Sequence, residues 1–231
     1  MTRLPDIPER YLLPPLFKLL LDPATNNLTT LDHFSLKKAQ HIMTDSEWTR
    51  ATFVRDPKER ILSAYMNKFV HDSYFIERCC EDYEDACRRM KSELSPQELF
   101  PYFLNRTLDC PDPHWEAQVL FIDDKWWPNI DFIGYMTSIS EDSKTLLKSI
   151  RSDKDGISAW DTFGKSGWGE SSNRGFMQKN EAAHATNSSK ILSKYYTPEL
   201  EKFVEKHWEI EWKLPEVYFE RNSIFHNKKK K

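Results

Sequence analysis

TFVRDPKERILSAYMNKF, residues 52–69, reads as the end of a strand, a sharp turn and a helix. Asp56 is a suitable N-cap, and Pro57 has its φ already fixed for the first helical position. Five apolar side chains recur at helical spacing and predict one buried stripe: Ile61, Leu62, Tyr65, Met66 and Phe69. The stretch therefore predicts a strand that ends at Arg55 and leads directly into a helix over residues 56–72.

This junction of strand and helix has the chemistry of an anion site. First-turn N–H groups and the helix dipole attract negative charge, and Arg55 can bind a phosphate through two parallel hydrogen bonds. Ser63 lies on the same side of the helix as Arg60 and can donate a hydroxyl hydrogen bond. A phosphate monoester fits these donors. The residues fit equally well a surface network that pairs Arg55 with Asp56, or Arg60 with a carboxylate.

The composition predicts an ordered chain. The 231 residues include 14 Phe, 9 Tyr and 8 Trp, enough for a sizeable core, and we expect one domain over residues 1–231. The net charge of −3 gives no general argument for a nucleic-acid partner, and none is expected. No run of about 18 apolar residues is present, so we expect no membrane span in this sequence.

The remaining chain alternates strands and helices. Ile130–Tyr135 reads as a second buried strand, so an α/β fold with a mainly parallel sheet is expected. Helices are expected over residues 35–43, 77–92, 95–104, 138–151 (capped by Ser140), 186–196 and 198–214. Five of the six glycines lie within residues 152–181, which we interpret either as a mobile lid over a site or as a disordered insertion. A basic tail occupies residues 227–231.

The four cysteines give no metal signature. Cys79, Cys80, Cys87 and Cys110 contain no C-x-x-C pair, so neither zinc nor another metal is expected. Cys79 and Cys87 could share a helix face, and buried free thiols are the expected state. One disulfide in a secretory compartment is the alternative, which spacing cannot decide.

Three sequence blocks carry a family resemblance. V-R-D-P-x-x-R-x-x-S-A-Y-x-x-K-F, with Phe53 before it, resembles the 3′-phosphate-binding motif of sulfotransferases that use 3′-phosphoadenosine 5′-phosphosulfate (PAPS). The form S-A-Y-x-N-K-F is typical of the Golgi carbohydrate sulfotransferases, which include the chondroitin, dermatan and HNK-1 enzymes. DPHWEAQ at 112–118, followed by IDFIGY, and HATNSSKILSKYYTPEL at 184–200 fit the same group. The resemblance covers about residues 48–214.

The resemblance implies a fold similar to that of P-loop nucleotide kinases, with a parallel sheet flanked by helices and PAPS at the carboxyl ends of the strands. It implies that Arg55 and Ser63 hold the 3′-phosphate. It also places three residues of the last block near the cofactor phosphates: Thr186, Ser189 and Lys190. The alternative is that the start of this block simply caps a helix.

The implied reaction is transfer of a sulfuryl group from PAPS to a hydroxyl of a carbohydrate acceptor. Like phosphoryl transfer, it needs a base near the acceptor hydroxyl and positive charge near the leaving phosphate. His114 is the candidate base, because histidine titrates near neutrality and this one lies in a shared block. The alternative is a structural histidine packed on Trp115. His71 is a weaker candidate for the base, and His184 is a candidate contact to cofactor or substrate.

One part of the family pattern is missing. These enzymes carry a P-K-x-G-x-T-like loop after the first strand, which binds the 5′-phosphosulfate, and the 54 residues before Arg55 contain no such loop. Three explanations are open: an N-terminally truncated chain, a gene model that begins too late, or a degenerate homologue. We expect truncation in preference to a complete domain, because a missing first strand would leave an apolar flank of the sheet exposed. The alternative function is a non-catalytic homologue or fragment with only the 3′-phosphate half of the site. A nucleotide kinase would need a Walker loop, which is absent.

The resemblance also implies a location. Enzymes of this group act in the Golgi lumen, and any membrane anchor would belong to a segment outside this sequence. Sequons at Asn27, Asn105 and Asn187 give slight support for a lumenal glycoprotein.

Overall fold

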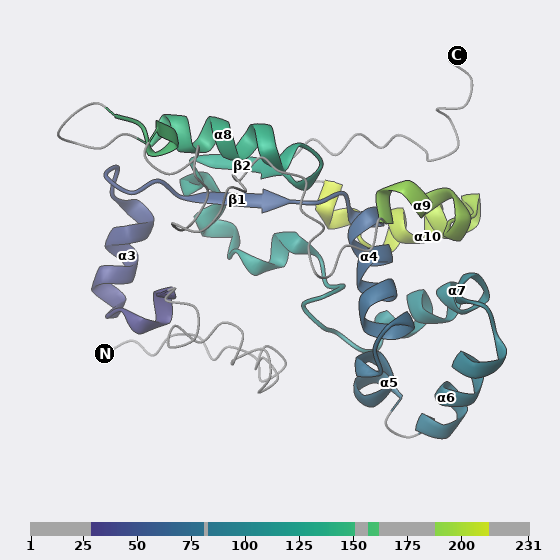
Figure 1. The fold of residues 1–231 in the computed structure, drawn as a ribbon. Coiled ribbons are helices and arrows are strands. Elements are labelled where there is room, and N and C mark those ends of the chain that lie inside the picture. The colour runs from purple at the N-terminus through teal and green to yellow at the C-terminus, as the bar shows by residue number, and fades with distance from the viewer. Residues whose placement is uncertain (1–28, 81–82, 151–156, 162–187, 213–231) are drawn as a thin grey trace, which may run out of the picture. The chain divides into compact units, whose positions relative to one another are not determined.

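The computed structural model describes residues 29–80, 83–150, 157–161 and 188–212 (Figure 1). The chain divides into two compact units, Met1–Trp48 and Thr49–Lys231. Our expectation of a single domain over residues 1–231 stays a prediction. The basic tail and nearly all of the expected loop at 152–181 lie outside the described residues.

The described part of the first unit is a short helical segment. It contains η2 (Leu31–His33) and α3 (Leu36–Thr44). Ser35 caps α3, and its hydroxyl accepts the N–H of Lys38 at 3.3 Å. The helix expected over residues 35–43 is confirmed.

The second unit contains a parallel pair of strands, β1 (Ala51–Val54) and β2 (Phe132–Tyr135). Arg50 fixes where they begin to pair, because its backbone carbonyl accepts the N–H groups of Asp131 and Phe132. The Arg50 side chain also donates two hydrogen bonds to the Asp131 carboxylate, at 2.9 and 3.0 Å. The predicted α/β class and the parallel pairing are confirmed.

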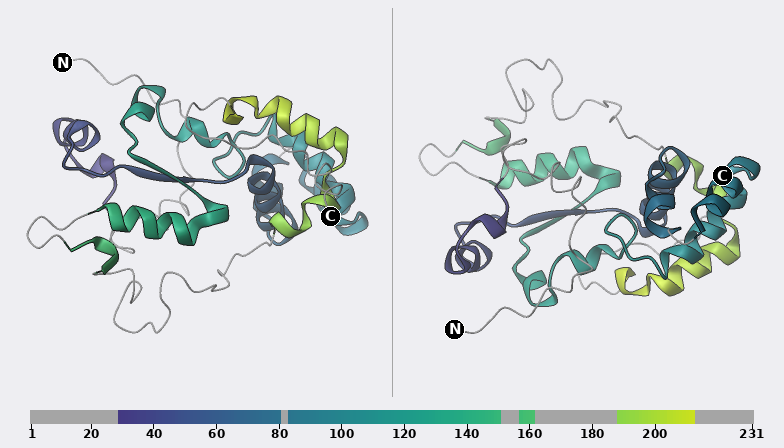
Figure 2. Two further views of the ribbon diagram at one scale, coloured as in Figure 1. Left: turned by 90° about the horizontal axis from the view of Figure 1, so that it is seen from above. Right: turned by 90° about the horizontal axis from the view of Figure 1, so that it is seen from below.

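Helical segments lie on both sides of the two strands. Figures 1 and 2 show α8 (Ile139–Ser149) on one side, and η5 (Gln118–Phe121) with η6 (Asp124–Asn129) on the other. The backbone of this part of the second unit is thus arranged as the layers of an α/β fold.

The beginning of α8 differs from the prediction. The N-cap is Ser138, at the end of η7 (Met136–Ser138), and Ser140 already lies inside the helix. The Asp142 carboxylate explains the shift, since it accepts the Ser138 hydroxyl and the backbone N–H of Tyr135, each at 2.7 Å. The assignment of Ser140 as the cap is therefore wrong.

The motif helix is present as predicted. α4 (Pro57–Tyr65) continues into a π-helical turn, η3 (Met66–Val70), and Asp56 caps α4 by accepting the Glu59 N–H at 3.0 Å. Four members of the expected apolar stripe are fully buried and the fifth is half-buried: Ile61, Leu62, Tyr65 and Phe69, with Met66. Their burial anchors the strand–helix junction on the core.

Further helices surround α4. They are α5 (Tyr74–Cys79), α6 (Glu84–Glu93), α7 (Pro96–Thr107), α9 (Ser188–Tyr195), α10 (Pro198–His207) and η9 (Glu209–Trp212). α7 begins with a capping box between Ser95 and Glu98, while α9 and α10 both contact α4. The core between these helices is largely aromatic and includes Tyr65, Phe69, Phe75, Phe100, Phe103 and Trp115. None of the helices in the described part of the chain is long and apolar enough to cross a bilayer.

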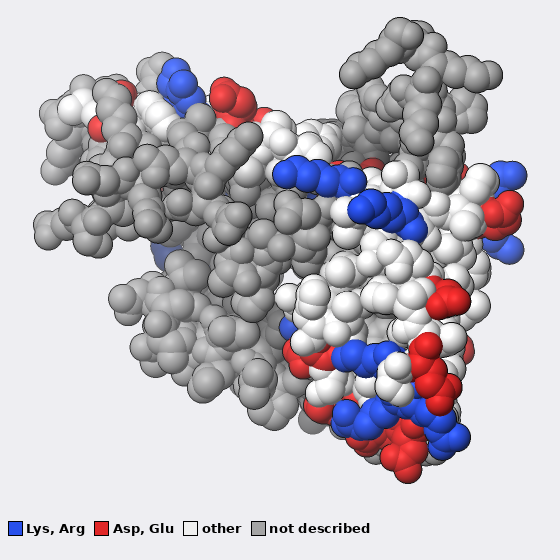
Figure 3. Space-filling model, turned by 45° about the vertical axis from the view of Figure 1, so that its right-hand side comes forward, with Lys and Arg blue, Asp and Glu red and all other residues white. Residues whose placement is uncertain are grey.

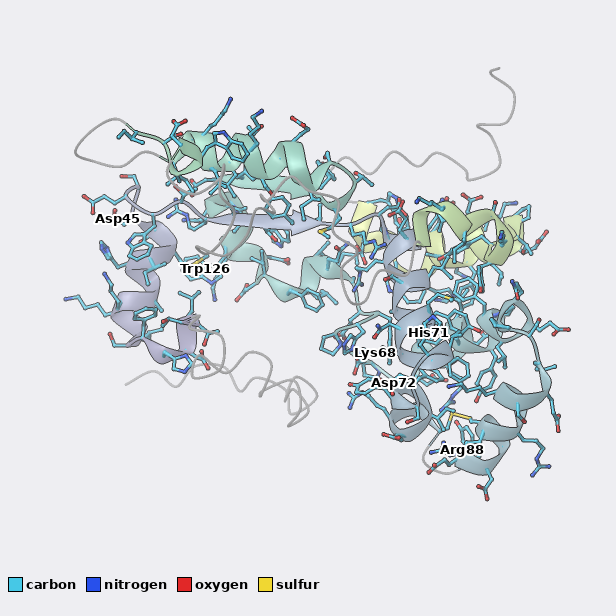
Figure 4. All side chains as sticks on the ribbon, in the orientation of Figure 1. Asp45, Lys68, His71, Asp72, Arg88 and Trp126 are labelled. Carbon is cyan, nitrogen blue, oxygen red and sulfur yellow. A yellow bond between two sulfur atoms is a disulfide. The ribbon has the colours of Figure 1, made fainter. Side chains whose placement is uncertain are left out.

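The cysteines correct two predictions. They form two disulfides, Cys79–Cys110 and Cys80–Cys87, so the expectation of buried free thiols is wrong. The single helix expected over residues 77–92 is also wrong, because α5 ends at Cys79 and α6 begins at Glu84. The cysteines therefore do not share one helix face, and they connect α5 to α6 and to the loop after α7 (Figure 4).

Candidate functional site

The site centres on the residue where β1 turns into α4. The Arg55 side chain is 26% exposed, and its Nε lies 3.6 Å from the Glu59 carboxylate. Ser63 is half-buried one helical turn beyond Glu59. Arg55 precedes α4 and reaches Glu59 through this contact, and Ser63 follows Glu59 four residues later, as its neighbour on the helix surface. The two predicted phosphate ligands are thus both neighbours of Glu59.

Two carboxyl groups lie beside Arg55. Burial raises the pKa of Glu59, although the positive charge of Arg55 opposes the shift. Burial also raises the pKa of Asp56, against the hydrogen bond from the Glu59 N–H. That N–H is therefore already occupied by the helix's own cap. An anion at this junction would depend more on the side chains of Arg55 and Ser63 than on the first-turn N–H groups.

The backbone of Arg55 is clamped by Gln118. The Gln118 Oε1 accepts the Arg55 N–H at 2.9 Å, and its Nε2 donates to the Arg55 carbonyl at 2.8 Å. The same Nε2 lies 2.6 Å from the carboxylate of Glu211. Our sequence reasoning missed Gln118, whose only signal was its place in the block at residues 112–118.

Arg60 belongs to a buried carboxylate network. Its side chain is 12% exposed, and the guanidinium donates to Glu211 at 3.2 Å and to the His114 carbonyl at 3.1 Å. Burial raises the pKa of Glu211, although the charge of Arg60 opposes the shift. The alternative interpretation of Arg60, pairing with a carboxylate, is thus correct, but the pair is buried. Arg60 links the motif helix to the loop that carries His114.

Lys58 is a second buried cation of the motif helix. Its Nζ donates to Glu201 at 2.6 Å and to Glu205 at 2.8 Å, and its backbone carbonyl accepts the Tyr196 hydroxyl at 3.0 Å. Burial alone would lower the pKa of Lys58, but the hydrogen bonds to the two glutamates raise it overall. These contacts join α4 to α10, so Lys58 has a structural role.

His114 is anchored to a buried carboxylate. Its Nδ1 lies 2.6 Å from Asp112 Oδ1, which also accepts the His114 backbone N–H at 2.9 Å. The His114 side chain is 17% exposed, and its ring centroid lies 5.3 Å from that of Tyr74 and 6.3 Å from that of Trp115. A histidine held at Nδ1 can act as a base at Nε2 or serve as a packing residue, so its role as the catalytic base stays a prediction.

The last sequence block is only partly described. Thr186 and His184 lie outside the described residues. Ser189 belongs to the first turn of α9, and Lys190 is exposed on the same helix, which packs against α4. The assignment of these residues to the cofactor phosphates stays a prediction.

His71 lies at the far end of the motif unit. It is exposed just after η3, where Figure 4 shows it near Lys68 and Asp72. It thus lies beyond the opposite end of the motif helix from Arg55. Among the described residues, no group of three or more His, Cys, Asp and Glu side chains is arranged to hold a metal ion.

Comparisons with known proteins place this site in context. Residues 18–214 match the sulfotransferase family. Human carbohydrate sulfotransferase 9 is 32% identical over 143 residues, which are 56% of this chain and 31% of that protein. Carbohydrate sulfotransferase 11 from Rattus norvegicus is 26% identical over 135 residues, 53% of this chain and 38% of that protein. Human carbohydrate sulfotransferase 8 is 30% identical over 134 residues, 54% of this chain and 31% of that protein.

The chain spans about a third of the length of these curated relatives. No solved structure gives a significant match. The family match, in contrast, includes every described element from η2 to η9. The chain belongs to the sulfotransferase family.

Proposed function

We propose that this protein takes part in transfer of a sulfuryl group from PAPS to a hydroxyl of a carbohydrate acceptor. The observation that carries the proposal is the strand–helix junction, where Gln118 clamps the Arg55 backbone and the Arg55 side chain lies beside Glu59, one helical turn before Ser63. The relatives named as carbohydrate sulfotransferases support the acceptor class. The chain spans about a third of the length of these relatives, so the activity that their names state comes to it only as part of this proposal.

The residues of the junction fit a phosphate monoester. Arg55 supplies a permanent charge and a forked set of donors, and Ser63 supplies a hydroxyl donor. We assign both residues to the 3′-phosphate of PAPS. When bound, PAPS would supply the sulfuryl group from its 5′-phosphosulfate. Thr186, Ser189 and Lys190 are assigned to the cofactor phosphates on the resemblance alone.

His114 is assigned as the base. It takes the proton of the acceptor hydroxyl at Nε2 while the hydroxyl oxygen forms its bond to sulfur and the bond from sulfur to the leaving phosphate oxygen breaks. General-base catalysis of this kind contributes about 10²- to 10⁴-fold in rate. The contact between Nδ1 and Asp112 supports this assignment, because an ionised carboxylate holds the proton on Nδ1 and so places the lone pair of neutral His114 on Nε2.

The two disulfides support an oxidising compartment, since such bonds persist in secretory lumens and are rare in the cytosol. We therefore assign the protein to the Golgi lumen. The sequon at Asn105 is consistent with a glycoprotein, because that residue is exposed on α7.

Nucleotide titration tests the site. We expect the purified chain to bind adenosine 3′,5′-bisphosphate more tightly than 5′-AMP in isothermal titration calorimetry. Arg55→Ala should lower the affinity for the bisphosphate by roughly 10- to 100-fold, because hydrogen bonds to charged groups contribute about 1.5–3 kcal/mol. Ser63→Ala should lower it less, and Arg88→Ala, which removes an exposed arginine on α6, should leave it unchanged. Equal affinity for both nucleotides, or no loss in the Arg55 and Ser63 variants, would overturn the assignment.

A second assay separates an enzyme from a binding homologue. The chain is incubated with ³⁵S-labelled PAPS and carbohydrate acceptors such as chondroitin, and labelled polysaccharide is counted. Transfer that depends on His114 supports the enzyme. Tight nucleotide binding without any transfer supports the alternative function, a non-catalytic homologue or fragment that retains the 3′-phosphate half of the site.

A further inference from the structure

We propose that Asp112 is a positioning residue for His114, and that Tyr74 and Arg78 hold its carboxylate in place for this role. The inference rests on the proposed function, because it assigns a purpose to His114 as the base. The Asp112 side chain is fully buried, and both of its oxygens accept hydrogen bonds. A buried carboxylate of this kind is stable only when its lone pairs are satisfied.

The two oxygens of Asp112 have different partners. Oδ1 receives the backbone N–H and the Nδ1 of His114, at 2.9 and 2.6 Å. Oδ2 receives the Tyr74 hydroxyl at 2.8 Å and the Arg78 Nε at 2.7 Å. Tyr74 and Arg78 both belong to α5, so one helix fixes the oxygen that His114 does not use.

This arrangement selects one histidine tautomer. An ionised carboxylate can only accept hydrogen bonds, so His114 must carry a proton on Nδ1 and present the lone pair of Nε2. Burial alone would raise the pKa of Asp112, but the hydrogen bonds from His114 and Tyr74 lower it, which keeps the carboxylate ionised at neutral pH. Nε2 is the nitrogen that a base in this position needs.

Several contacts that do not involve the imidazole hold the loop around Asp112. The Cys79–Cys110 disulfide ties its start to α5, and Arg78 Nη2 donates to the Pro111 carbonyl at 3.0 Å. The Trp115 indole donates to the Cys110 carbonyl at 2.7 Å. With the backbone fixed by these contacts, the bond from Asp112 to the His114 ring has its main effect on the orientation and tautomer of that ring.

The backbone of His114 is held from both sides. Asp112 accepts its N–H, and Arg60 of the motif helix donates to its carbonyl at 3.1 Å. Supporting contacts of this kind keep a functional side chain within a narrow range of positions. The unit that carries the proposed 3′-phosphate ligands thus contacts His114 through Arg60, and α5 supports the same histidine through Asp112.

Nitrogen NMR of the full chain tests this inference without any assay of catalysis. The protein is labelled with ¹⁵N-histidine, and the ring signals of His114 are identified by their loss in His114→Gln. At a pH where the imidazole is neutral, we expect a protonated Nδ1 and an unprotonated Nε2. In Asp112→Asn, the amide can donate to Nδ1, so we expect at least about half of the population to move to the Nε2–H tautomer.

Asp109→Asn is the matched control, because it neutralises an exposed carboxylate three residues before Asp112 and leaves Asp112 and its partners intact. The Nδ1–H signal should persist in this variant. A wild-type spectrum dominated by the Nε2–H tautomer overturns the inference, whether or not Asp112→Asn folds. An unchanged tautomer in a folded Asp112→Asn protein overturns it equally.

Transfer kinetics separate this inference from the proposed function. If the function holds, Asp112→Asn should lower kcat by about twofold or more at nearly constant KM for PAPS, and His114→Gln should cost less activity in the Asp112→Asn background than in the wild-type chain. If the predicted tautomer is observed but the chain binds no adenosine 3′,5′-bisphosphate, the proposed function fails and the pairing of Asp112 with His114 stands. An active chain that loses no activity in His114→Gln overturns the catalytic purpose of the pairing.

Discussion

The side-chain amide of Gln118 pairs with both backbone polar groups of Arg55. The Arg55 N–H donates to Oε1 at 2.9 Å, and Nε2 donates to the Arg55 carbonyl at 2.8 Å. An amide that both accepts and donates in this way imitates the edge of a neighbouring strand at the point where β1 ends. The arginine at the centre of the candidate site is thus fixed by a residue 63 positions away in the chain.

Replacing the donor half of this clamp should weaken nucleotide binding. In Gln118→Glu, the carboxylate cannot donate to the Arg55 carbonyl, and it repels the neighbouring Glu211. We expect the affinity for adenosine 3′,5′-bisphosphate to fall about 10-fold or more, which corresponds to about 1.4 kcal/mol. Calorimetric titration should show little change for 5′-AMP, and Gln97→Glu on the exposed face of α7 serves as the control. An equal loss for both nucleotides would mean that the clamp supports the fold in general.

The buried cation of the motif helix should be important for stability. Lys58→Met leaves the carboxylate of Glu201 buried without its partner, so we expect the free energy of unfolding to fall by about 3–5 kcal/mol. Urea unfolding followed by circular dichroism measures this change. Adding Glu201→Gln to Lys58→Met should recover part of the loss, because the uncompensated charge is then removed.

An exposed ion pair provides the comparison for Lys58. Arg88 pairs with Glu84 one turn away on α6, and both side chains are close to half exposed. Arg88→Met should therefore lower the free energy of unfolding by less than about 1 kcal/mol. Figure 3 shows other acidic and basic side chains interspersed on one face of the protein, where substitutions should have similarly small effects. A similar loss for Lys58→Met and Arg88→Met would contradict the structural role of Lys58.

The disulfides should contribute unequally to stability. The paired cysteines are 31 residues apart in Cys79–Cys110 and 7 residues apart in Cys80–Cys87. Because a longer closed loop restricts the unfolded chain more, removing the first pair by Cys79→Ser/Cys110→Ser should cost about 3–4 kcal/mol, and removing the second about 2–3 kcal/mol. Thiol titration of the denatured, unreduced protein should detect no free cysteine. Four reactive thiols in that experiment would contradict both bonds.

The close approach of two residues across the strands should make one small substitution costly. Phe53 lies opposite Gly134, and a Cβ at position 134 would come within 3.0 Å of three atoms of the Phe53 ring. Gly134→Ala should lower the free energy of unfolding by about 1–3 kcal/mol, as overpacking does. Adding Phe53→Leu should reduce that cost, which a double-mutant cycle measures. An increase in stability on Gly134→Ala would show that the ring moves aside without strain.

Local chemistry made the central unit predictable. The Asp56 cap, Pro57 at the first helical position and the apolar stripe all lie within one short stretch, and each agrees with the others. The predicted N-cap and buried stripe are confirmed in α4 and η3. The same applies to α7, whose capping box joins residues three apart.

Errors arose where contacts other than helical spacing decide the structure. The stretch 77–92 is rich in charged residues and was expected to form one helix, but α5 ends at Cys79 and α6 begins at Glu84, and two disulfides join this region, one of them to Cys110 in another loop. The start of α8 was misplaced for a local reason, because the prediction did not include the contacts of the Asp142 side chain with Ser138 and Tyr135 just before it. Neither feature follows from helical spacing.

The sequence by itself determined the strand–turn–helix unit and the family to which its motif belongs, because caps, prolines and apolar periodicity act over a few residues. Only the tertiary structure decided that Gln118 holds Arg55, that Glu211 binds Arg60 and that Asp112 orients His114. Gln118 and Glu211 lie far from their partners in the chain, and Asp112 reaches His114 through a loop whose shape is set by α5 and a disulfide. The spacing of residues in a sequence does not specify such loop geometry, since it depends on which distant surfaces pack together.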